Sequence, residues 1–368
     1  MKLDDFKLER YFARYEFNVR HTLCASDCES FSIHELLSKK ELSKFLALRL
    51  NYTESQGNPE LRKEVSKLYT QVKPENIIVC TPQEGIFIAM NTLLSSGDKI
   101  IVQSPCYQSL FEIAKGIGCE VVLWNPSEND KGWRWDIGSL KEQVDSKTKL
   151  IVVNSPHNPT GYLFSKQEYQ EIMKIAQQKG CYVFSDEMYR LLEYDIKDRL
   201  PSGSDVYKKC ISLSGMSKTF GMPGLRMGWL SVRDKELFNR IMSFKDYTTI
   251  CNGALNEQVT IAALRKKDKI IKRNLKIIKD NLKLLDAFFS KYQDKFSWTR
   301  PKAGSITFVE IKSNTNSYDF CENVVKKAGV MLLPSTEYSY GDRHFRIGFG
   351  RKNMPQALAA FEEYLKRF

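Results

Sequence analysis

Short apolar runs alternate with stretches of helical periodicity from about residue 46 onward. The apolar runs stand at residues 77–80, 99–102, 120–124, 149–154, 181–187, 210–215 and 228–232, and helical stretches between them include 85–94, 110–118 and 168–180. Runs such as IVVN are apolar at successive positions, which is typical of strands buried on both faces. The pattern predicts an α/β fold with a mostly parallel sheet between two layers of helices.

The pattern changes after a long basic stretch, Arg265 to Lys283, in which apolar residues recur at helical spacing. We expect one long helix there, with its lysines in solvent. Strand-like segments at 296–311, 330–335 and 344–350 follow, with helices from Tyr318 to Ala328 and from Met354 to Phe368, and predict a smaller α+β unit. We therefore expect a large domain at residues 46–280 and a small domain made of residues 1–45 and 281–368.

The composition indicates where in the cell the chain works and whether disulfides or a metal site are expected. No stretch of 18 apolar residues occurs, and the N-terminus mixes acids and bases where a signal peptide would place an apolar block, so we expect a cytoplasmic chain without a membrane partner. The nine cysteines show no CxxC pair and no zinc-ligand spacing, which predicts free thiols and no metal site. Cys24 and Cys28 are the one pair whose spacing leaves a redox role open.

The net charge of +12 would suit a nucleic-acid partner or an anionic ligand. Much of the excess lies in the basic stretch, whose lysines have a simple explanation as the solvated face of a helix. No helix-turn-helix, RNP or zinc-finger pattern accompanies it, so we predict no nucleic-acid partner.

Polar residues follow three of the predicted strands. The segment 149–154 is followed by SPHNPTG, the strand in 181–187 ends in DEMY, and 210–215 is followed by MSKTFGMPGLRMG. Because ligands in an open parallel sheet bind beyond the carboxyl ends of the strands, these segments are expected at one site. A lone lysine beside glycines is usually a surface residue, but the order of the three segments favours a pyridoxal phosphate site.

Pyridoxal phosphate requires three kinds of partner. A lysine amine must form an imine with its aldehyde, a carboxylate must keep the ring nitrogen protonated, and the phosphate needs a cation, hydroxyls and backbone N–H groups. Lys218, Asp186 and the pair Ser217 and Arg226 have the chemistry for these roles.

With these motifs the sequence resembles the class I/II aminotransferases, which are fold-type I pyridoxal phosphate enzymes, over nearly the whole chain. The resemblance implies a seven-stranded, mostly parallel sheet in the large domain. It also implies that Gln83 and the amides from Glu84 onward hold the phosphate, together with Ser214 or Ser217, and that Tyr107 stacks on the cofactor ring.

The resemblance assigns further residues. Asn158 and Tyr189 would contact the phenolic oxygen of the cofactor, and Arg346 would bind the α-carboxylate of the substrate, with Ser26 in the substrate wall. Tyr52 would reach into a neighbouring subunit and touch its phosphate, which implies a homodimer with shared active sites.

Three features depart from the family pattern. Pro82, after Thr81 in the phosphate cradle, has no N–H to donate. Gly215 stands three residues before Lys218, where many members place a serine. The segment around Ser26, LCASDCES, lacks the usual glycine beside the substrate.

The expected reaction is transfer of an amino group between an L-amino acid and a 2-oxo acid in ping-pong order, with Lys218 as the proton shuttle. A pyridoxal phosphate lyase or cyclase acting on an amino acid is the alternative, because the same residues serve several bond cleavages. We do not expect a ligand-sensing transcription regulator, because the small-domain segment starts within the first residues and leaves no room for a DNA-binding module. A Ser/Lys hydrolase would leave Asp186 and Asn158 unexplained.

A histidine and the N-terminal segment can be explained without a role in catalysis. We expect His157 to shape its loop rather than act as a base, and the N-terminal segment with Glu9, Arg10, Arg14 and Glu16 to be a solvated amphipathic helix rather than part of the site entrance. The identity of the amino donor stays open at this stage, with acidic, aromatic and basic side chains all possible.

Overall fold

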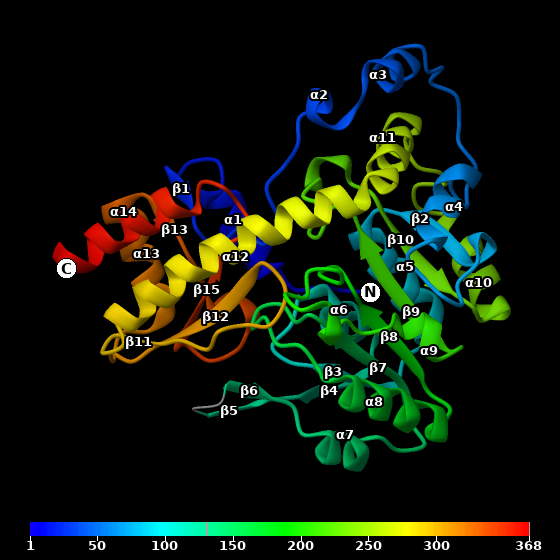
Figure 1. Cartoon of the computed structure of the whole chain (residues 1–368). Coiled ribbons are helices and arrows are strands. Elements are labelled where there is room, and N and C mark those ends of the chain that lie inside the picture. Colours follow the sequence, from blue (N-terminus) through cyan, green and yellow to red (C-terminus); the bar gives the residue numbers. More distant parts are fainter. Residues whose placement is uncertain (130–131, 368) are drawn as a thin grey trace.

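The chain folds into two α/β parts, each with its own sheet, in a computed structural model that describes residues 1–129 and 132–367 (Figure 1). The larger part contains a seven-stranded sheet in the order β2-β10-β9-β8-β7-β3-β4. Its strands are β2 (Ile77–Cys80), β3 (Lys99–Gln103), β4 (Glu120–Trp124), β7 (Thr148–Asn154), β8 (Tyr182–Asp186), β9 (Cys210–Gly215) and β10 (Gly228–Val232). Only β10 runs antiparallel to its neighbours within this sheet, so the prediction of a mostly parallel sheet is confirmed.

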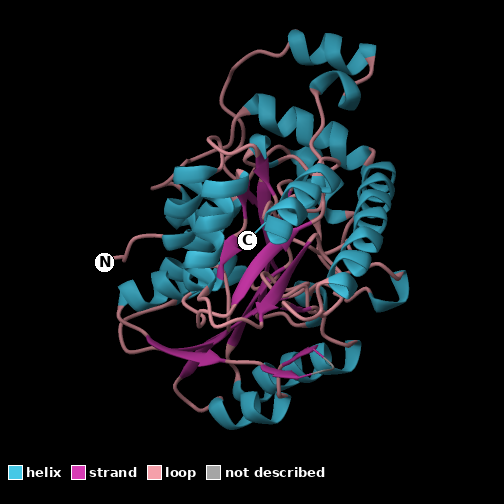
Figure 2. Ribbon diagram, turned by 90° about the vertical axis from the view of Figure 1, so that its left-hand side faces the viewer, coloured by secondary structure: helices cyan, strands magenta, loops and turns pink. Residues whose placement is uncertain are grey.

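Helices cover both faces of this sheet, as Figure 2 shows. Ile100 and Val102 of β3 belong to one core with residues of α5, α6 and α10, whereas Ile101 belongs to another core with residues of α7 and α8. Successive side chains of a strand point to opposite faces, which explains why the strand runs are apolar throughout. The helices are α5 (Pro82–Leu93), α6 (Ser109–Ile117), α7 (Ile137–Gln143), α8 (Lys166–Lys179), α9 (Gly203–Val206) and α10 (Lys235–Lys245).

The smaller part has an antiparallel sheet in the order β11-β12-β15-β14, as expected for an α+β unit. The N-terminal strand β1 (His21–Thr22) pairs in parallel with β13 (Val330–Met331) and joins the two ends of the chain in this part. The remaining strands and helices are α1 (Lys7–Tyr15), β11 (Phe296–Ser297), β12 (Ile306–Ile311), α13 (Ser317–Ala328), β14 (Leu333–Pro334), the 3-10 helix η4 (Ser335–Tyr338), β15 (His344–Gly348) and α14 (Met354–Arg367). Phe368, placed in the last predicted helix, lies outside the described residues.

The predicted basic helix exists but its bounds differ from the prediction. Helix α12 (Lys267–Lys291) runs between the two parts in Figure 1, and Ile270, Ile278 and Leu282 on one face are buried. Arg265 instead ends α11 (Ala254–Arg265), because Lys266 leaves helical geometry with φ −106° and ψ 12°. Periodicity alone did not reveal this break, since the apolar spacing continues across it.

The N-terminal segment contacts both parts. The short helices α2 (Ile33–Leu36) and α3 (Lys39–Leu46) bring Leu36 and Leu37 into a core with Val259 of α11 and Leu61 of α4 (Pro59–Ser66). We propose that the smaller domain ends near residue 30 rather than 45 on the N-terminal side, and that its second boundary lies near residue 280, inside α12. No helix in the described residues is both long and apolar enough to cross a membrane.

The smaller elements complete the described structure. They are the hairpin of β5 (Ser127–Asn129) and β6 (Gly132–Arg134), and the 3-10 helices η1 (Pro74–Asn76), η2 (Ile196–Asp198) and η3 (Pro223–Leu225).

Candidate active site

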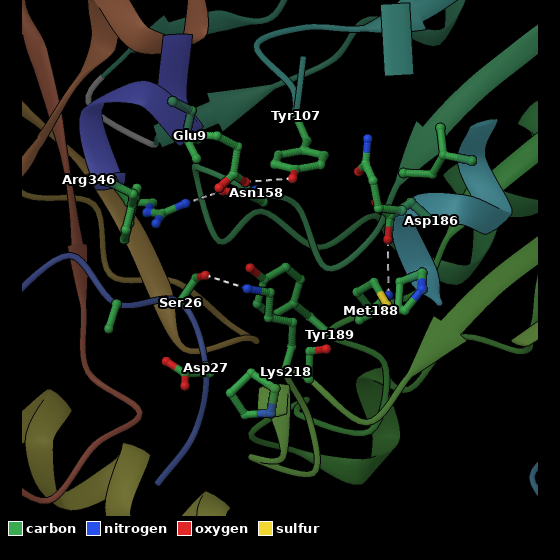
Figure 3. Close-up of a pocket in the computed structure, with 18 of the residues that line it drawn as sticks. Glu9, Ser26, Asp27, Tyr107, Asn158, Asp186, Met188, Tyr189, Lys218 and Arg346 are labelled. Atoms are coloured by element: carbon green, nitrogen blue, oxygen red, sulfur yellow. Dashed lines mark hydrogen bonds between the residues drawn. The ribbon is translucent and has the colours of Figure 1, made fainter. Parts of the chain in front are cut away.

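A cavity of about 380 Å³ lies at the carboxyl ends of the central strands, between the two parts of the molecule. It is lined by residues that follow β7, β8 and β9, by the first turn of α5, and by residues from the N-terminal segment and β15. Figure 3 shows Lys218, Asp186, Tyr189, Asn158, Tyr107 and Arg346 around this cavity. The sheet edge therefore brings together the polar segments that follow the three strands.

Lys218 lies three residues beyond the end of β9, and its side chain lines the cavity and is half-buried. Its amine donates a hydrogen bond to Ser26 Oγ at 2.8 Å, and its carbonyl oxygen accepts the N–H groups of Cys28 and Gly221. Burial lowers the pKa of the amine, partly opposed by the nearby Asp27 carboxylate. A larger fraction of the amine is therefore neutral, which is the form that attacks a carbonyl and accepts a proton.

Asp186 is the last residue of β8 and is 7% exposed. Its Oδ1 accepts the N–H of Met188 at 3.1 Å, and its carbonyl oxygen accepts the amide of Asn154 at 2.9 Å. Burial raises the pKa of the carboxyl group to about 6, and its side chain has no ion pair among the described residues. A buried carboxylate without a cation is held ready for a positively charged ligand.

Tyr189 and Asn158 each present a polar group to the cavity. The Tyr189 hydroxyl is buried and has no hydrogen-bond partner among the described residues. The Asn158 Oδ1 accepts hydrogen bonds from Tyr338 Oη at 2.9 Å and from Arg346 Nη1 at 3.2 Å. These two bonds fix the amide so that its NH₂ group remains available to a ligand.

Arg346 of β15 is 2% exposed and has no ion pair with any described residue. Its Nε and Nη2 donate to the carbonyl oxygen of Cys24 at 3.2 and 2.9 Å. Nη1 contacts Asn158 and the hydroxyl of Tyr338. A buried guanidinium that is held only by neutral groups favours an anionic ligand, and its planar fork matches a carboxylate.

The other wall of the cavity combines a helix start with a second unpaired cation. Gln83 stands in the first turn of α5, Ser217 is buried beside Lys218, and Arg226 lines the same cavity without an ion pair among the described residues. The first N–H groups of a helix and a guanidinium together form an anion site.

Two residues predicted at this wall do not turn their side chains to the cavity. The Glu84 carboxylate accepts the N–H of Thr81 at 3.2 Å and the hydroxyls of Thr248 and Thr249 at 2.6 Å, so only its amide remains a candidate for the phosphate. Ser214 lies within β9 opposite Trp229 and does not line the cavity, whereas Ser217, beyond the strand end, does.

The departures at Pro82 and Gly215 have one structural cause. A Cβ atom on Gly215 would lie 3.0 Å from the ring carbon Cγ of Pro82 and 2.9 Å from the carbonyl oxygen of Met227, and a Cβ on Gly228 would lie 2.7 Å from the same ring carbon. The proline ring therefore fills the space of a side chain at position 215. The two departures compensate each other in packing.

The N-terminal helix lines the cavity, so the prediction of a purely solvated helix is wrong. Leu8, Glu9, Phe12 and Glu16 face the cavity, and the Glu9 carboxylate accepts the hydroxyl of Tyr107 at 2.7 Å. Arg10 and Arg14 do not line it; Arg14 instead contacts Tyr318. The amphipathic pattern was correct, but the sequence does not tell which surface of the molecule the helix covers.

The wall around Ser26 lacks the expected glycine, and two glycines stand opposite it instead, Gly348 at the end of β15 and Gly350 two residues beyond that strand. A Cβ on Gly348 would lie 1.8 Å from the carbonyl oxygen of Ala25, and a Cβ on Gly350 would lie 2.4 Å from that of Asp27. These glycines let the backbone of residues 25–27 approach β15 closely. Ser26 Oγ faces Lys218, and the carbonyl oxygen of Ser26 accepts the hydroxyl of Ser305 at 2.7 Å.

Three residues in or beside the cavity were missed by the sequence reasoning. Asp27 forms an ion pair with Arg351 at 2.8 Å, and both line the cavity. Tyr338 connects Arg346 with Asn158. Asp27 stands in the segment LCASDCES without any pattern that marks it, and the three residues become neighbours of the site only when the two ends of the chain meet.

Tyr52, Cys24, Cys28 and His157 lie outside the cavity lining. Tyr52 is 94% exposed and stands far in sequence from any lining residue of its own chain. Cys24 and Cys28 are both buried and free. His157 is 1% exposed, and its Nδ1 pairs with Thr160 Oγ1 at 2.8 Å, which agrees with a role in shaping the loop.

The described residues fit pyridoxal phosphate. The amine of the half-buried Lys218 with its lowered pKa, the buried Asp186 carboxylate, the buried Tyr189 hydroxyl and the Arg226 guanidinium beside a helix start all face one cavity. Among the described residues, Asp186 and Arg226 have no ion pair, and the Tyr189 hydroxyl has no hydrogen-bond partner. These four groups are the complements of an aldehyde, a protonated pyridine nitrogen, a phenolic oxygen and a phosphate.

Comparison with known proteins agrees with this geometry. The family model "Aminotransferase class I and II" matches residues 31–361. A probable aspartate aminotransferase of Methanocaldococcus jannaschii is 26% identical over 86% of this chain and 85% of its own length. The capreomycidine synthase of Streptomyces vinaceus is 26% identical over 99% of this chain and 93% of its own length.

A solved structure is also similar over the whole chain. A pyridoxal-phosphate-dependent aminotransferase from Streptococcus suis 89-1591 has a TM-score of 0.94 and 31% identity, and the match covers 100% of this chain and 99% of the other. The chain therefore belongs to the class I and II aminotransferases and is a pyridoxal-phosphate-dependent enzyme.

Proposed function

We propose that this aminotransferase carries out its amino transfer at the described cavity, with Lys218 as the attachment point of the cofactor. The observation that carries the proposal is the position of the Lys218 amine in one cavity with the Asp186 carboxylate and the unpartnered Tyr189 hydroxyl. An L-amino acid gives its amino group in the first half of the reaction, and a 2-oxo acid takes it up in the second, in ping-pong order.

When bound, pyridoxal phosphate supplies an aldehyde that bonds to amines and a ring that accepts electrons. Asp186 would place a negative charge at the ring nitrogen and keep it protonated. Asn158 and Tyr189 would donate hydrogen bonds to the phenolic oxygen. Gln83, Ser217, Arg226 and the backbone amide of Glu84 would hold the phosphate, and the ring of Tyr107 lies on the opposite side of the cavity from Lys218 (Figure 3).

Arg346 binds and orients the α-carboxylate of the substrate. Its two bonds to the Cys24 carbonyl and those of its Nη1 to Asn158 and Tyr338 hold the guanidinium in place before substrate arrives. Such pre-organisation lowers the entropy lost on binding. The substrate Cα is thereby held within reach of the Lys218 amine.

Lys218 moves the proton at the substrate Cα. Burial lowers the pKa of its amine, which raises the fraction of the neutral, proton-accepting form at any given pH. The Lys218 amine donates a hydrogen bond to Ser26 Oγ, and this bond orients the lone pair of the amine between one proton transfer and the next.

A homodimer with shared active sites is part of the proposal. Leu46, Leu50 and Tyr52 are 75%, 77% and 94% exposed, and Leu50 and Tyr52 lie beside exposed Leu255 along a second hollow of the surface. An exposed apolar surface of this kind is typical of an interface. Tyr52 is proposed to contact the phosphate in the neighbouring subunit. Mixing the inactive variants Lys218→Ala and Tyr52→Ala tests this, because shared sites regain activity in mixed dimers and separate sites do not.

The test of the function is an absorbance spectrum of the purified protein with pyridoxal phosphate, before and after amino acids are added. The proposal expects a visible band that borohydride reduction removes, and a shift to the amino form of the cofactor on addition of the amino donor, with release of the corresponding 2-oxo acid. A protein that binds the cofactor but forms neither product contradicts it.

A cyclase is the second candidate, because the similarity to capreomycidine synthase extends over 99% of this chain, including the N-terminal helix that lines the cavity. Mass spectrometry of the products separates the two: an aminotransferase releases a 2-oxo acid, whereas a cyclase releases a ring-closed amino acid and leaves the cofactor spectrum unchanged after turnover.

A further inference from the structure

Eight charged side chains line the cavity, and six of them already have a partner or a role. The proposed function, on which this inference rests, uses Lys218, Arg226 and Arg346 as cations and Asp186 as an anion. Asp27 and Arg351 neutralise each other through two hydrogen bonds of 3.0 Å. Glu9 and Glu16 are left as two carboxylates without a cation.

The carboxylates of Glu9 and Glu16 have no ion pair among the described residues. Within the described part of the chain, the Glu9 carboxylate accepts a hydrogen bond from the hydroxyl of Tyr107 alone, and the Glu16 carboxylate accepts none. Burial raises the pKa of Glu16; the cations Arg351 and Lys218 oppose this rise, and the carboxylates of Asp27 and Glu9 add to it. A positive charge placed between them would relieve this repulsion.

Helix α1 places these carboxylates beside the site of the substrate. Glu9 lies in α1, and Glu16 is the C-cap residue, whose φ of −51° and ψ of −39° continue the helical geometry. Because they are seven residues apart, both face the same side, about 10 Å apart along the helix axis. Phe12 stands between them, and its ring centroid lies 5.8 Å from the guanidinium carbon of Arg346. A substrate whose α-carboxylate rests on Arg346 therefore has the apolar side chains of Leu8 and Phe12 and the two carboxylates next to it.

An independent feature shows that this cavity takes a ligand. The Tyr189 hydroxyl, on a residue that is 3% exposed, faces the same cavity without a partner. The carboxylates thus stand in a built site rather than on open surface.

We infer that Glu9 and Glu16 select an amino donor whose side chain ends in an amine or guanidinium carried on several methylene groups. The methylene groups lie along Leu8 and Phe12, and the terminal cation lies between the two carboxylates. An aspartate side chain would instead bring a third negative charge to this wall, and Arg351, bound to Asp27, is not free to balance it.

Matched pairs of donors test the selection. L-Arginine and L-citrulline have nearly the same shape but differ in charge, as do L-lysine and L-norleucine. We expect kcat/KM to be about tenfold or more higher for the charged member of each pair, and higher for L-arginine than for L-aspartate. Glu16→Gln and Glu9→Gln should each lower the ratio of kcat/KM for L-arginine to that for L-norleucine about tenfold. Asp5→Asn, a surface substitution next to the same helix, changes neither.

A binding measurement that involves no turnover supplies the second readout. Guanidinovalerate carries a carboxylate and a guanidinium but no α-amine, and ureidovalerate is its neutral analogue. By calorimetry on the wild-type holoenzyme, the guanidinium compound is expected to bind about tenfold more tightly, and Glu16→Gln to remove the difference. A preference for L-aspartate or L-norleucine overturns the inference while amino transfer stands. If no donor reacts but the binding difference persists, the proposed function fails and the charge selection stands.

Discussion

The proposed cofactor end and the proposed substrate end of the cavity are built in different ways. Lys218, Asp186 and Asn158 all stand within four residues of the end of a strand in one parallel sheet. Glu9, Ser26 and Arg346 come instead from the first 26 residues and from a strand of the second sheet. A parallel sheet places its strand ends together whatever the loops contain, whereas the chain ends meet only through tertiary packing.

The difference suggests that the two ends tolerate change differently. The cofactor end is fixed by the sheet and by the chemistry of one cofactor. The substrate end depends on β1 pairing with β13 and on the close approach of residues 25–27 to Gly348 and Gly350. We expect changes at the cofactor end to remove all activity and changes at the substrate end to alter mainly which donor is used.

The largest effect is expected for Lys218→Ala. Loss of the amine removes both the attachment point and the base, so activity should fall about a thousandfold or more. The absorbance spectrum with borohydride reduction measures the attachment, and Lys209→Ala on the surface is the control. Full activity in Lys218→Ala would show that the reaction takes place at another site, and that this end of the cavity does not hold the cofactor.

Asp186→Asn should reduce turnover yet stabilise the cofactor-free protein. Burial raises the pKa of Asp186 from 3.8 to about 6, so the folded chain binds a proton more readily than the unfolded chain between these pH values. The ionised carboxylate therefore destabilises the folded chain. This destabilisation is absent below about pH 4, grows as pH rises from about 4 to about 6, and is complete above about pH 6. Urea denaturation near pH 8 should show Asp186→Asn about 3 kcal/mol more stable, with the difference vanishing near pH 4. Equal stability at both pH values would show that the carboxylate is not strained by burial.

Arg346→Lys tests whether the substrate end can be changed without affecting the cofactor end. A lysine cannot form the two-pronged contact with a carboxylate, so the KM for amino donors should rise about a hundredfold. The cofactor spectrum without substrate should stay as in the wild type, since Arg346 belongs to the substrate end. A changed spectrum would mean that the bond from Arg346 to Asn158 couples the two ends.

Gly215→Ser tests the packing around Pro82. The added Cβ would lie within 3.0 Å of Pro82 Cγ and 2.9 Å of the Met227 carbonyl, so stability should fall by about 1–3 kcal/mol in thermal or chemical unfolding. Gly180→Ser, at a position with no atom near its Cβ but with a positive φ of 72°, separates clash from backbone strain. An unchanged stability would show that the proline ring does not fill this space.

Tyr189→Phe should have the smallest effect. The hydroxyl has no hydrogen-bond partner among the described residues, so its removal should leave the melting temperature unchanged, while activity falls about tenfold. Tyr338→Phe is the matched control, because it removes a hydroxyl that contacts both Asn158 and Arg346. A fall in the melting temperature of Tyr189→Phe as large as in Tyr338→Phe would contradict the assignment of a free hydroxyl.

The sequence by itself determined the sheet and the cofactor end. Continuous apolar runs identify strands buried on both faces, and Asn158, Asp186 and Lys218 follow such runs directly, so their meeting at one edge required no knowledge of the loops. The free cysteines and the long basic helix were also predictable, because they depend on residue spacing alone.

Only the tertiary structure decided the substrate end. The pattern of α1 predicts an amphipathic helix, but the surface that Glu9 and Glu16 face is set by the packing of Phe12 against Arg346, more than 300 residues later in the chain. The pairing of Asp27 with Arg351 and the filling of the Gly215 space by Pro82 likewise depend on contacts between distant segments. Local periodicity records which residues share a face of an element, and only packing determines what that face meets.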